Sequence, residues 1–225
     1  MDGGAIRGLA WLLFLVPLAG HAERSTFEVI YAESEDRACA SSRGYDIKAE
    51  WVRELNEVLP SFRSLWREKG AAMFDALASL THRPNDAFVA PVRLTLCDMP
   101  SQSFGGPSVN MRFALRSFTT SPVSLRYKVD TAFHESLHGF VVQHAPRRSA
   151  LVNAHRAESQ CVLNHLHLLA LQKAVLLAIG DEAALQQVVS IDSQLPSGCY
   201  KRAWALVNES DSAYKQYVAE LAREH

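Results

Sequence analysis

The stretch FHESLHGF, residues 133–140, places two histidines four positions apart with a glutamate beside the first. Four positions are slightly more than one helical turn, so in a helix His134 and His138 lie on one face. Two imidazoles in this arrangement can bind one Zn²⁺, and Glu135 can accept a proton from a water molecule at the metal. The spacing is typical of a hydrolytic zinc site, although in a chain with nine histidines the pattern alone could arise by chance.

A hydrolytic zinc site needs a third protein ligand and an open position for water. One candidate is Glu158, which lies 20 residues after His138 on an expected long apolar helix. The other is His144, at the position of the third histidine in the metzincin motif HExxHxxGxxH. The glycine which that motif requires is replaced by Val141, and all four methionines precede the motif, so the methionine turn of metzincins has no candidate. The pattern therefore favours Glu158.

With His134, His138 and Glu158 as ligands, the chain resembles the gluzincin metallopeptidases, the thermolysin-like clan. In that clan an HExxH helix is followed by a glutamate ligand on a second helix. The resemblance, over roughly residues 27–180, implies a small zincin-like α+β fold, a Zn²⁺ cofactor, Glu135 as the general base, and a peptide or protein substrate. Many members carry an aspartate shortly after the glutamate ligand, and the segment ESQCV, residues 158–162, has none.

Three further residues could line such a cleft. His165 lies seven residues after Glu158, on the same face of the expected helix, and His155 lies three residues before Glu158. Either histidine could supply a proton donor, but the pattern favours a partly buried structural role for both. Tyr200 could stabilise an oxyanion, as a downstream tyrosine or histidine does in gluzincins.

The composition of the 225 residues, with 48% hydrophobic and 21% charged, is typical of a globular protein with one domain. A net charge of −1 gives no basic surface for nucleic acid or for an anionic membrane.

Residues 1–22 have the layout of a secretory signal peptide, with the apolar run LAWLLFLVPLAG before the small residues Gly20 and Ala22. An uncleaved anchor helix is the alternative. We expect residues 23–225 to form one zincin-like domain, with an upper lobe of strands and helices over about 23–143 and a lower helical lobe over about 144–225. A secreted or periplasmic location follows, with no stable membrane association after cleavage.

Four cysteines remain after that cleavage, an even number that predicts two disulfides in an oxidising compartment. Three pairings are open, and proximity in the chain weakly favours Cys39 with Cys97 and Cys161 with Cys199. No CxxC-type pair is present, which argues against a four-thiolate zinc site.

Strands followed by helices indicate an α+β protein. Strands are expected at 26–32, 91–97 and 109–118, the last from a strict period-2 alternation. A helix is expected after the N-cap residue Asp46, with Pro60 interrupting it. Further helices are expected at about 61–68, 71–80, 129–143, 150–179, 182–190, 199–208 and 213–224.

The alternating strand suggests that an extended peptide binds along Val109 to Phe118 by β-augmentation. The loop Phe104 to Ser108 would act as a mobile flap, because Gly105 and Gly106 permit wide backbone freedom. Two alternatives stay open. The chain could be a non-catalytic exported protein that binds a partner or a metal on a zincin scaffold, or its HExxH helix could be purely structural.

Overall fold

The computed structural model describes residues 27–83 and 90–223, so the expected signal peptide lies outside the described residues. The fold is mixed and mostly helical, in agreement with the predicted α+β class. Its elements are β1 (Val29–Tyr31), α1 (Glu33–Arg43), α2 (Ala49–Leu65), α3 (Ala71–Thr81), β2 (Val92–Thr95), β3 (Ser108–Asn110), α4 (Leu125–His144), α5 (Ala150–Ala154), α6 (Gln160–Ala178), α7 (Glu182–Asp192), α8 (Cys199–Val207) and α9 (Ala213–Ala222).

The three strands form one parallel sheet in the order β1-β2-β3, with Val29 opposite Val92 and Leu94 opposite Val109. Parallel neighbours need long crossovers. The first crossover contains α1, α2 and α3, and the second is the loop 96–107. All three β3 residues are buried, as expected for a parallel sheet covered by helices.

The expected strand over residues 109–118 is wrong beyond Asn110. Met111 has φ −93° and ψ −12°, which ends the extended conformation, and a short 3₁₀ turn follows at Arg112–Ala114. Val109, Met111 and Leu115 are nevertheless fully buried. Phe113 is exposed, however, and Asn110 and Arg112 are buried, so the alternation marks neither an extended backbone nor one buried face over the whole segment.

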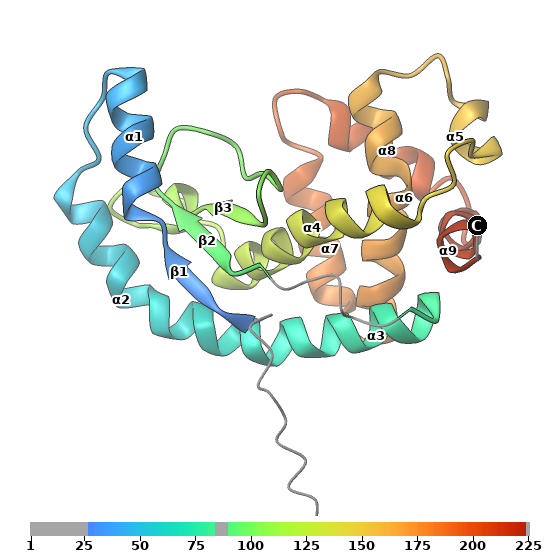
Figure 1. The fold of residues 1–225 in the computed structure, drawn as a ribbon, viewed down its shortest axis with the longest axis horizontal. Helices are drawn as coiled ribbons and strands as arrows, with labels where there is room; N and C mark the ends of the chain where they lie inside the picture. The colour runs from blue at the N-terminus through green and yellow to red at the C-terminus, as the bar shows by residue number, and fades with distance from the viewer. Residues whose placement is uncertain (1–26, 84–89, 224–225) are drawn as a thin grey trace, which may run out of the picture.

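Helices α2 and α3 form one continuous rod through a π-helical segment, Trp66–Gly70, as Figure 1 shows along the lower edge. The expected N-cap at Asp46 is wrong, because α2 begins at Ala49, and Pro60 lies inside the helix. Leu55, Leu59 and Phe62 bury one stripe of α2, and this burial carries the helix through the proline.

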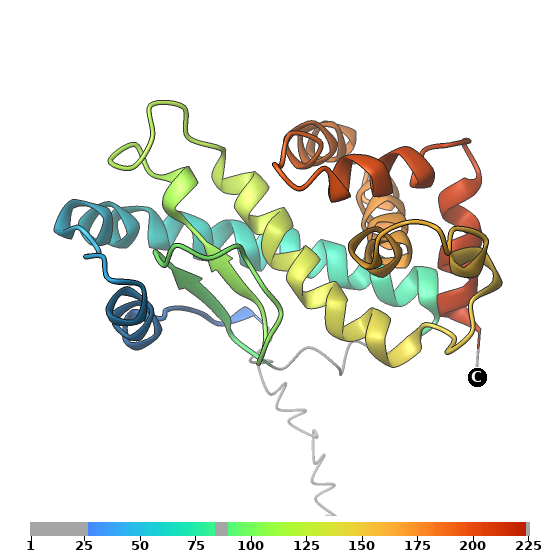
Figure 2. The ribbon, with the colours of Figure 1, turned by 90° about the horizontal axis from the view of Figure 1, so that it is seen from above.

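Helix α4 crosses the middle of the molecule, between the sheet and the C-terminal helices (Figures 1 and 2). It contacts β3 and α2 on one side and α6 and α7 on the other. Helix α6 contacts α3, α4, α7, α8 and α9, so it is the central helix of the C-terminal part. In the described ranges α6 alone is long and apolar enough to cross a membrane, but 67% of that window is buried inside the protein, as in a core helix.

The single helix expected over residues 150–179 is also wrong, because the chain breaks between α5 and α6. Ser159 has φ −64° and ψ 153°, and its hydroxyl accepts a hydrogen bond from Val162 N, so it is the N-cap of α6. A serine that satisfies one of the free N–H groups of a first turn favours a helix start at that point. Glu158 consequently lies outside both helices.

Both disulfides favoured by the sequence are present. Cys39 pairs with Cys97 and Cys161 pairs with Cys199, each with Cα atoms 6.0 Å apart. The first joins α1 to the end of β2, and the second joins the starts of α6 and α8. No cysteine is free, which indicates folding in an oxidising, extracellular environment.

Candidate metal centre

The HExxH residues lie on α4, as predicted. The Ser124 hydroxyl caps the helix by accepting a hydrogen bond from Tyr127 N at 3.0 Å. Phe133 and Leu137 are fully buried on the core side of the helix. His134 and His138 lie one turn apart, with ring centroids 5.1 Å from each other and the ring planes at 76°, in an edge-to-face arrangement.

The third histidine of the cluster is His165, in the second turn of α6. Its ring centroid is 5.6 Å from that of His134 and 5.3 Å from that of His138. One ligand nitrogen from each ring lies within 4.8 Å of the other two, so the three residues could hold a metal ion. A second such group, Cys161, His165 and Cys199, contains the disulfide sulfurs, which are already bonded to each other.

Hydrogen bonds fix the orientation and tautomer of two of the rings. His134 Nδ1 is 3.1 Å from Gln172 Oε1, and Gln172 Nε2 donates to the Asp130 carbonyl oxygen. His165 Nδ1 is 2.6 Å from the carbonyl oxygen of Cys161. Because these oxygens only accept hydrogen bonds, Nδ1 carries the proton in both rings and Nε2 keeps its lone pair.

His165 Nε2 has an unusual environment. The residue is only 8% exposed, and Nε2 has no hydrogen-bond partner among the residues that the structure describes. A buried polar atom without a partner is costly. A metal ion bound by the three histidines would give this lone pair its partner.

The three imidazoles are neutral. Burial lowers the pKa of His134 well below its usual value, and the nearby His138 and His165 lower it further. Burial likewise lowers the pKa of His138 to about 4 and lowers that of His165. Neutral imidazole is the form that binds a metal, so these rings need not lose a proton near pH 7.

Glu135 lies beside this cluster and is 5% exposed. Burial, and then the Asp192 charge, raise its pKa to about 8. Its Oε2 is 3.8 Å from His138 Nε2. A cation at the histidines would oppose the effect of burial and favour the carboxylate, which is the form that a general base needs.

Tyr200, in the first turn of α8, completes the near surroundings of the cluster. Its hydroxyl oxygen is 3.5 Å from His134 Nε2, and its ring centroid is 4.6 Å from that of His165. Burial raises its pKa, with smaller contributions from Glu135 and Asp192. The phenol therefore keeps its proton and can donate a hydrogen bond at the site.

A cavity of about 420 Å³ opens beside the cluster and is lined by His134, Glu135 and Tyr200. Its other walls come from the loop after β2, from the N-terminal half of α4, and from the segment between α7 and α8. This volume lies in the range of cavities that hold small molecules or peptide side chains.

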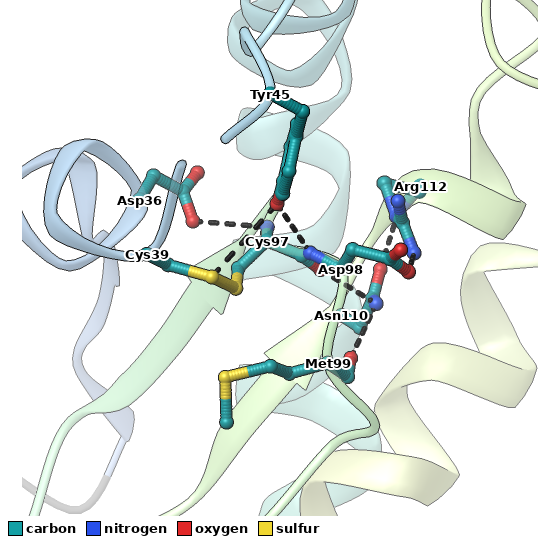
Figure 3. A network of polar contacts seen from close by, with 8 residues as sticks. All are labelled: Asp36, Cys39, Tyr45, Cys97, Asp98, Met99, Asn110 and Arg112. Carbon is teal, nitrogen blue, oxygen red and sulfur yellow. Dashed lines mark hydrogen bonds and ion pairs between the residues drawn. A yellow bond between two sulfur atoms is a disulfide. The ribbon is translucent and has the colours of Figure 1, made fainter. Parts of the chain in front are cut away.

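The loop after β2, which contributes Asp98 and Met99 to the cavity wall, is held by the polar contacts drawn in Figure 3. The Asp36 carboxylate accepts hydrogen bonds from Leu96 N and Cys97 N. The Asn110 side chain donates to the carbonyl oxygens of Cys97 and Met99 at 3.0 and 2.6 Å. Together with the disulfide at Cys97, these bonds hold the wall of the cavity in place.

Glu158 and His144 lie outside the histidine cluster. The Glu158 carboxylate accepts hydrogen bonds from Arg202 Nε and Nη2 at 2.8 and 2.5 Å, and this interaction lowers its pKa. His144 ends α4 and packs its ring on Phe140. Of the two third ligands considered from the sequence, neither is brought to His134 and His138.

The outer edge of β3, expected to pair with a substrate, is partly occupied. Gln102 and Ser108 exchange backbone hydrogen bonds of 2.8 and 2.9 Å, and the Ser101 hydroxyl accepts from Asn110 N. The neighbouring loop is also held, because the Arg93 guanidinium donates to the carbonyl oxygens of Phe104 and Gly105. These contacts leave the outer edge of β3 only partly free to pair with another strand.

Sequence reasoning named His165 without favouring it as a ligand, and it missed Gln172 and Lys128. A signal for each was present. Gln172 follows His165 by two helical turns on a mostly apolar helix, and Lys128 precedes Glu135 by two turns on α4. Polar residues that repeat at this spacing on a buried helix mark one functional face.

Comparison with known proteins gave no match. No protein-family model, no curated protein and no solved structure is significantly similar to this chain. The resemblance to gluzincins stays a prediction, and the features that bear on function are the geometry of the histidine cluster and of the cavity.

Proposed function

We propose that the chain is an exported zinc-dependent peptidase whose metal is held by His134, His138 and His165. The observation that carries this proposal is the buried His165 Nε2, which has no protein partner in the described part of the chain and lies beside two further imidazoles. In this proposal His165 takes the place that the sequence favoured for Glu158.

The donor set fits zinc. Three neutral imidazoles are a common protein ligand set for catalytic Zn²⁺, and they leave a fourth position open. His134 Nδ1 faces a side-chain oxygen, and His165 Nδ1 faces a backbone carbonyl oxygen. Acceptors of these kinds commonly orient histidines that bind zinc. Both disulfides support export.

Zinc bound at this site would supply Lewis acidity, which polarises a carbonyl group and lowers the pKa of water. Glu135 accepts the proton of the attacking water and returns it to the leaving amine. The Tyr200 hydroxyl, 3.5 Å from His134 Nε2, donates a hydrogen bond to the oxygen on which negative charge develops. The cavity beside Glu135 receives a side chain of the peptide.

Metal analysis combined with a peptide-library cleavage assay tests the proposal. We expect about one zinc per chain and chelator-sensitive hydrolysis. Glu135→Gln should keep the zinc but lower turnover by about 10²-fold or more, because it removes the proton acceptor. His155→Ala, a change in the turn outside the cluster, is the matched control and should retain activity.

Parental turnover in Glu135→Gln would exclude Glu135 as the base. Zinc uptake without hydrolysis of any library member would instead identify a non-catalytic metal-binding protein. Absence of zinc would leave the HExxH helix with a structural role.

A further inference from the structure

Two basic residues line the same cavity as Glu135 and are almost fully buried. Lys128, on α4, is 6% exposed, and Arg112, in the 3₁₀ turn after β3, is 8% exposed. The Arg112 guanidinium is 4.8 Å from the Phe118 ring centroid and pairs with Asp98, as Figure 3 shows. Arg112 Nε is buried and has no hydrogen-bond partner within the described ranges.

Lys128 has no counter-charge among the residues that the structure describes. No ion pair joins its ammonium group to a carboxylate there, and the ammonium nitrogen lies 5.8 Å from the centroid of the Tyr127 ring. The four acidic residues that line the cavity all have other neighbours. Asp98 pairs with Arg112, and Asp130 pairs with Arg126. Asp192 accepts hydrogen bonds from Tyr127 and Trp204, and Glu135 lies beside His138.

A buried cation without a counter-charge is costly, and proteins rarely keep one unless it is paired or binds a ligand. Burial, and then the nearby Arg112, lower the pKa of Lys128 to about 8. An anion in the cavity, which both residues line, would relieve this repulsion. A carboxylate matches the fork of donors on a guanidinium.

We propose that Lys128 and Arg112 form a subsite that binds a carboxylate group of the substrate. The carboxylate belongs either to an acidic side chain or to the C-terminus of the peptide. This inference rests on the proposed peptidase function and adds the class of substrate to it.

The position of this carboxylate in the substrate follows from the helix geometry. Lys128 and Glu135 are seven residues apart on one face of α4, which is about 10 Å along the helix axis. An extended peptide advances about 3.3 Å per residue. The carboxylate should therefore lie within about three residues of the bond that is cleaved.

Paired peptide libraries test the subsite. Each library contains either Glu or Gln at the varied positions and has either a free or an amidated C-terminus. We expect the wild-type protein to cleave the carboxylate-bearing member about 10-fold more efficiently, through a lower KM, and within about three residues of that group. A preference for Glu over Gln identifies a side chain, and a preference for the free acid over the amide identifies the C-terminus.

Three variants separate the role of Lys128 from general effects. Lys128→Met should abolish the preference, Lys128→Arg should retain it, and Lys215→Met, at an exposed position on α9, should leave it unchanged. Equal cleavage of both members by the wild-type protein, or a preference that survives Lys128→Met, would overturn the subsite.

A binding measurement distinguishes this inference from the peptidase proposal. The fluorescence anisotropy of labelled Glu and Gln peptides, and of free-acid and amidated forms, is measured on protein kept in excess chelator, where no hydrolysis is expected. Tighter binding of the carboxylate-bearing form supports the subsite even if no peptide is ever cleaved. Equal binding of all forms overturns it even if the protein is a peptidase.

Discussion

At the scale of single residues, the candidate metal centre depends on which ring nitrogen each histidine presents. His134 Nδ1 faces the Gln172 side-chain oxygen and His165 Nδ1 faces the Cys161 carbonyl oxygen. Both acceptors are buried or backbone groups that cannot easily turn away. These two rings are therefore held in place before any ligand arrives, with one ligand nitrogen from each of the three histidines within 4.8 Å of the others, and this lowers the cost of ordering the site.

A substitution of Gln172 tests this orientation. Gln172→Leu removes the acceptor for the His134 Nδ1 proton and should weaken zinc affinity by about 10- to 100-fold. Gln172→Glu keeps an acceptor at the same position and should retain most of the affinity. Competition with a chelating dye gives the affinities, and unchanged zinc affinity in Gln172→Leu would contradict the assigned role.

At the scale of elements, the centre joins α4 to α6, and α6 is in turn tied to α8 by the disulfide between Cys161 and Cys199. Cys161 also provides the carbonyl that orients His165, and Cys199 directly precedes Tyr200. This disulfide therefore fixes a candidate metal ligand and a candidate oxyanion donor at once. The disulfide between Cys39 and Cys97 fixes the cavity wall instead (Figure 3).

Removal of each disulfide in turn should separate these effects. Both double Cys→Ser variants should lose about 2–4 kcal/mol of unfolding free energy, as is usual for loops of this length. The variant that lacks Cys161 and Cys199 should in addition bind zinc more weakly, because His165 is then less well held. The variant that lacks Cys39 and Cys97 is the matched control, and a similar zinc affinity in both variants would contradict the positioning role.

Local signals in the sequence predicted most helices correctly. They failed for elements whose position or direction depends on contacts between distant parts of the chain. The helix around HExxH and those near residues 182, 199 and 213 were predicted, because each has a clear apolar stripe. Helix α1 was missed because it buries only Asp36 and Ala40 and has no such stripe. The parallel direction of the strands depends on a long crossover that no local pattern reveals.

At the scale of the whole molecule, the choice of third ligand shows the limit of spacing arguments. Glu158 and His165 are seven residues apart, so a single continuous helix would place both on one face. Ser159 is the N-cap of α6, so the helix begins after Glu158. The Glu158 carboxylate accepts hydrogen bonds from Arg202 instead. His165 lies in the second turn of α6, beside His138 of α4. The packing of α6 on α4 thus determines which residue reaches the centre.

The zinc affinities of His165→Ala and Glu158→Ala, compared with wild type, test the central claim most directly. We predict that His165→Ala loses zinc affinity by about 100-fold or more, because it removes a ligand, whereas Glu158→Ala binds zinc almost normally. Both proteins should be shown to fold by circular dichroism before titration. Normal zinc binding by His165→Ala together with its loss in Glu158→Ala would contradict the three-histidine centre.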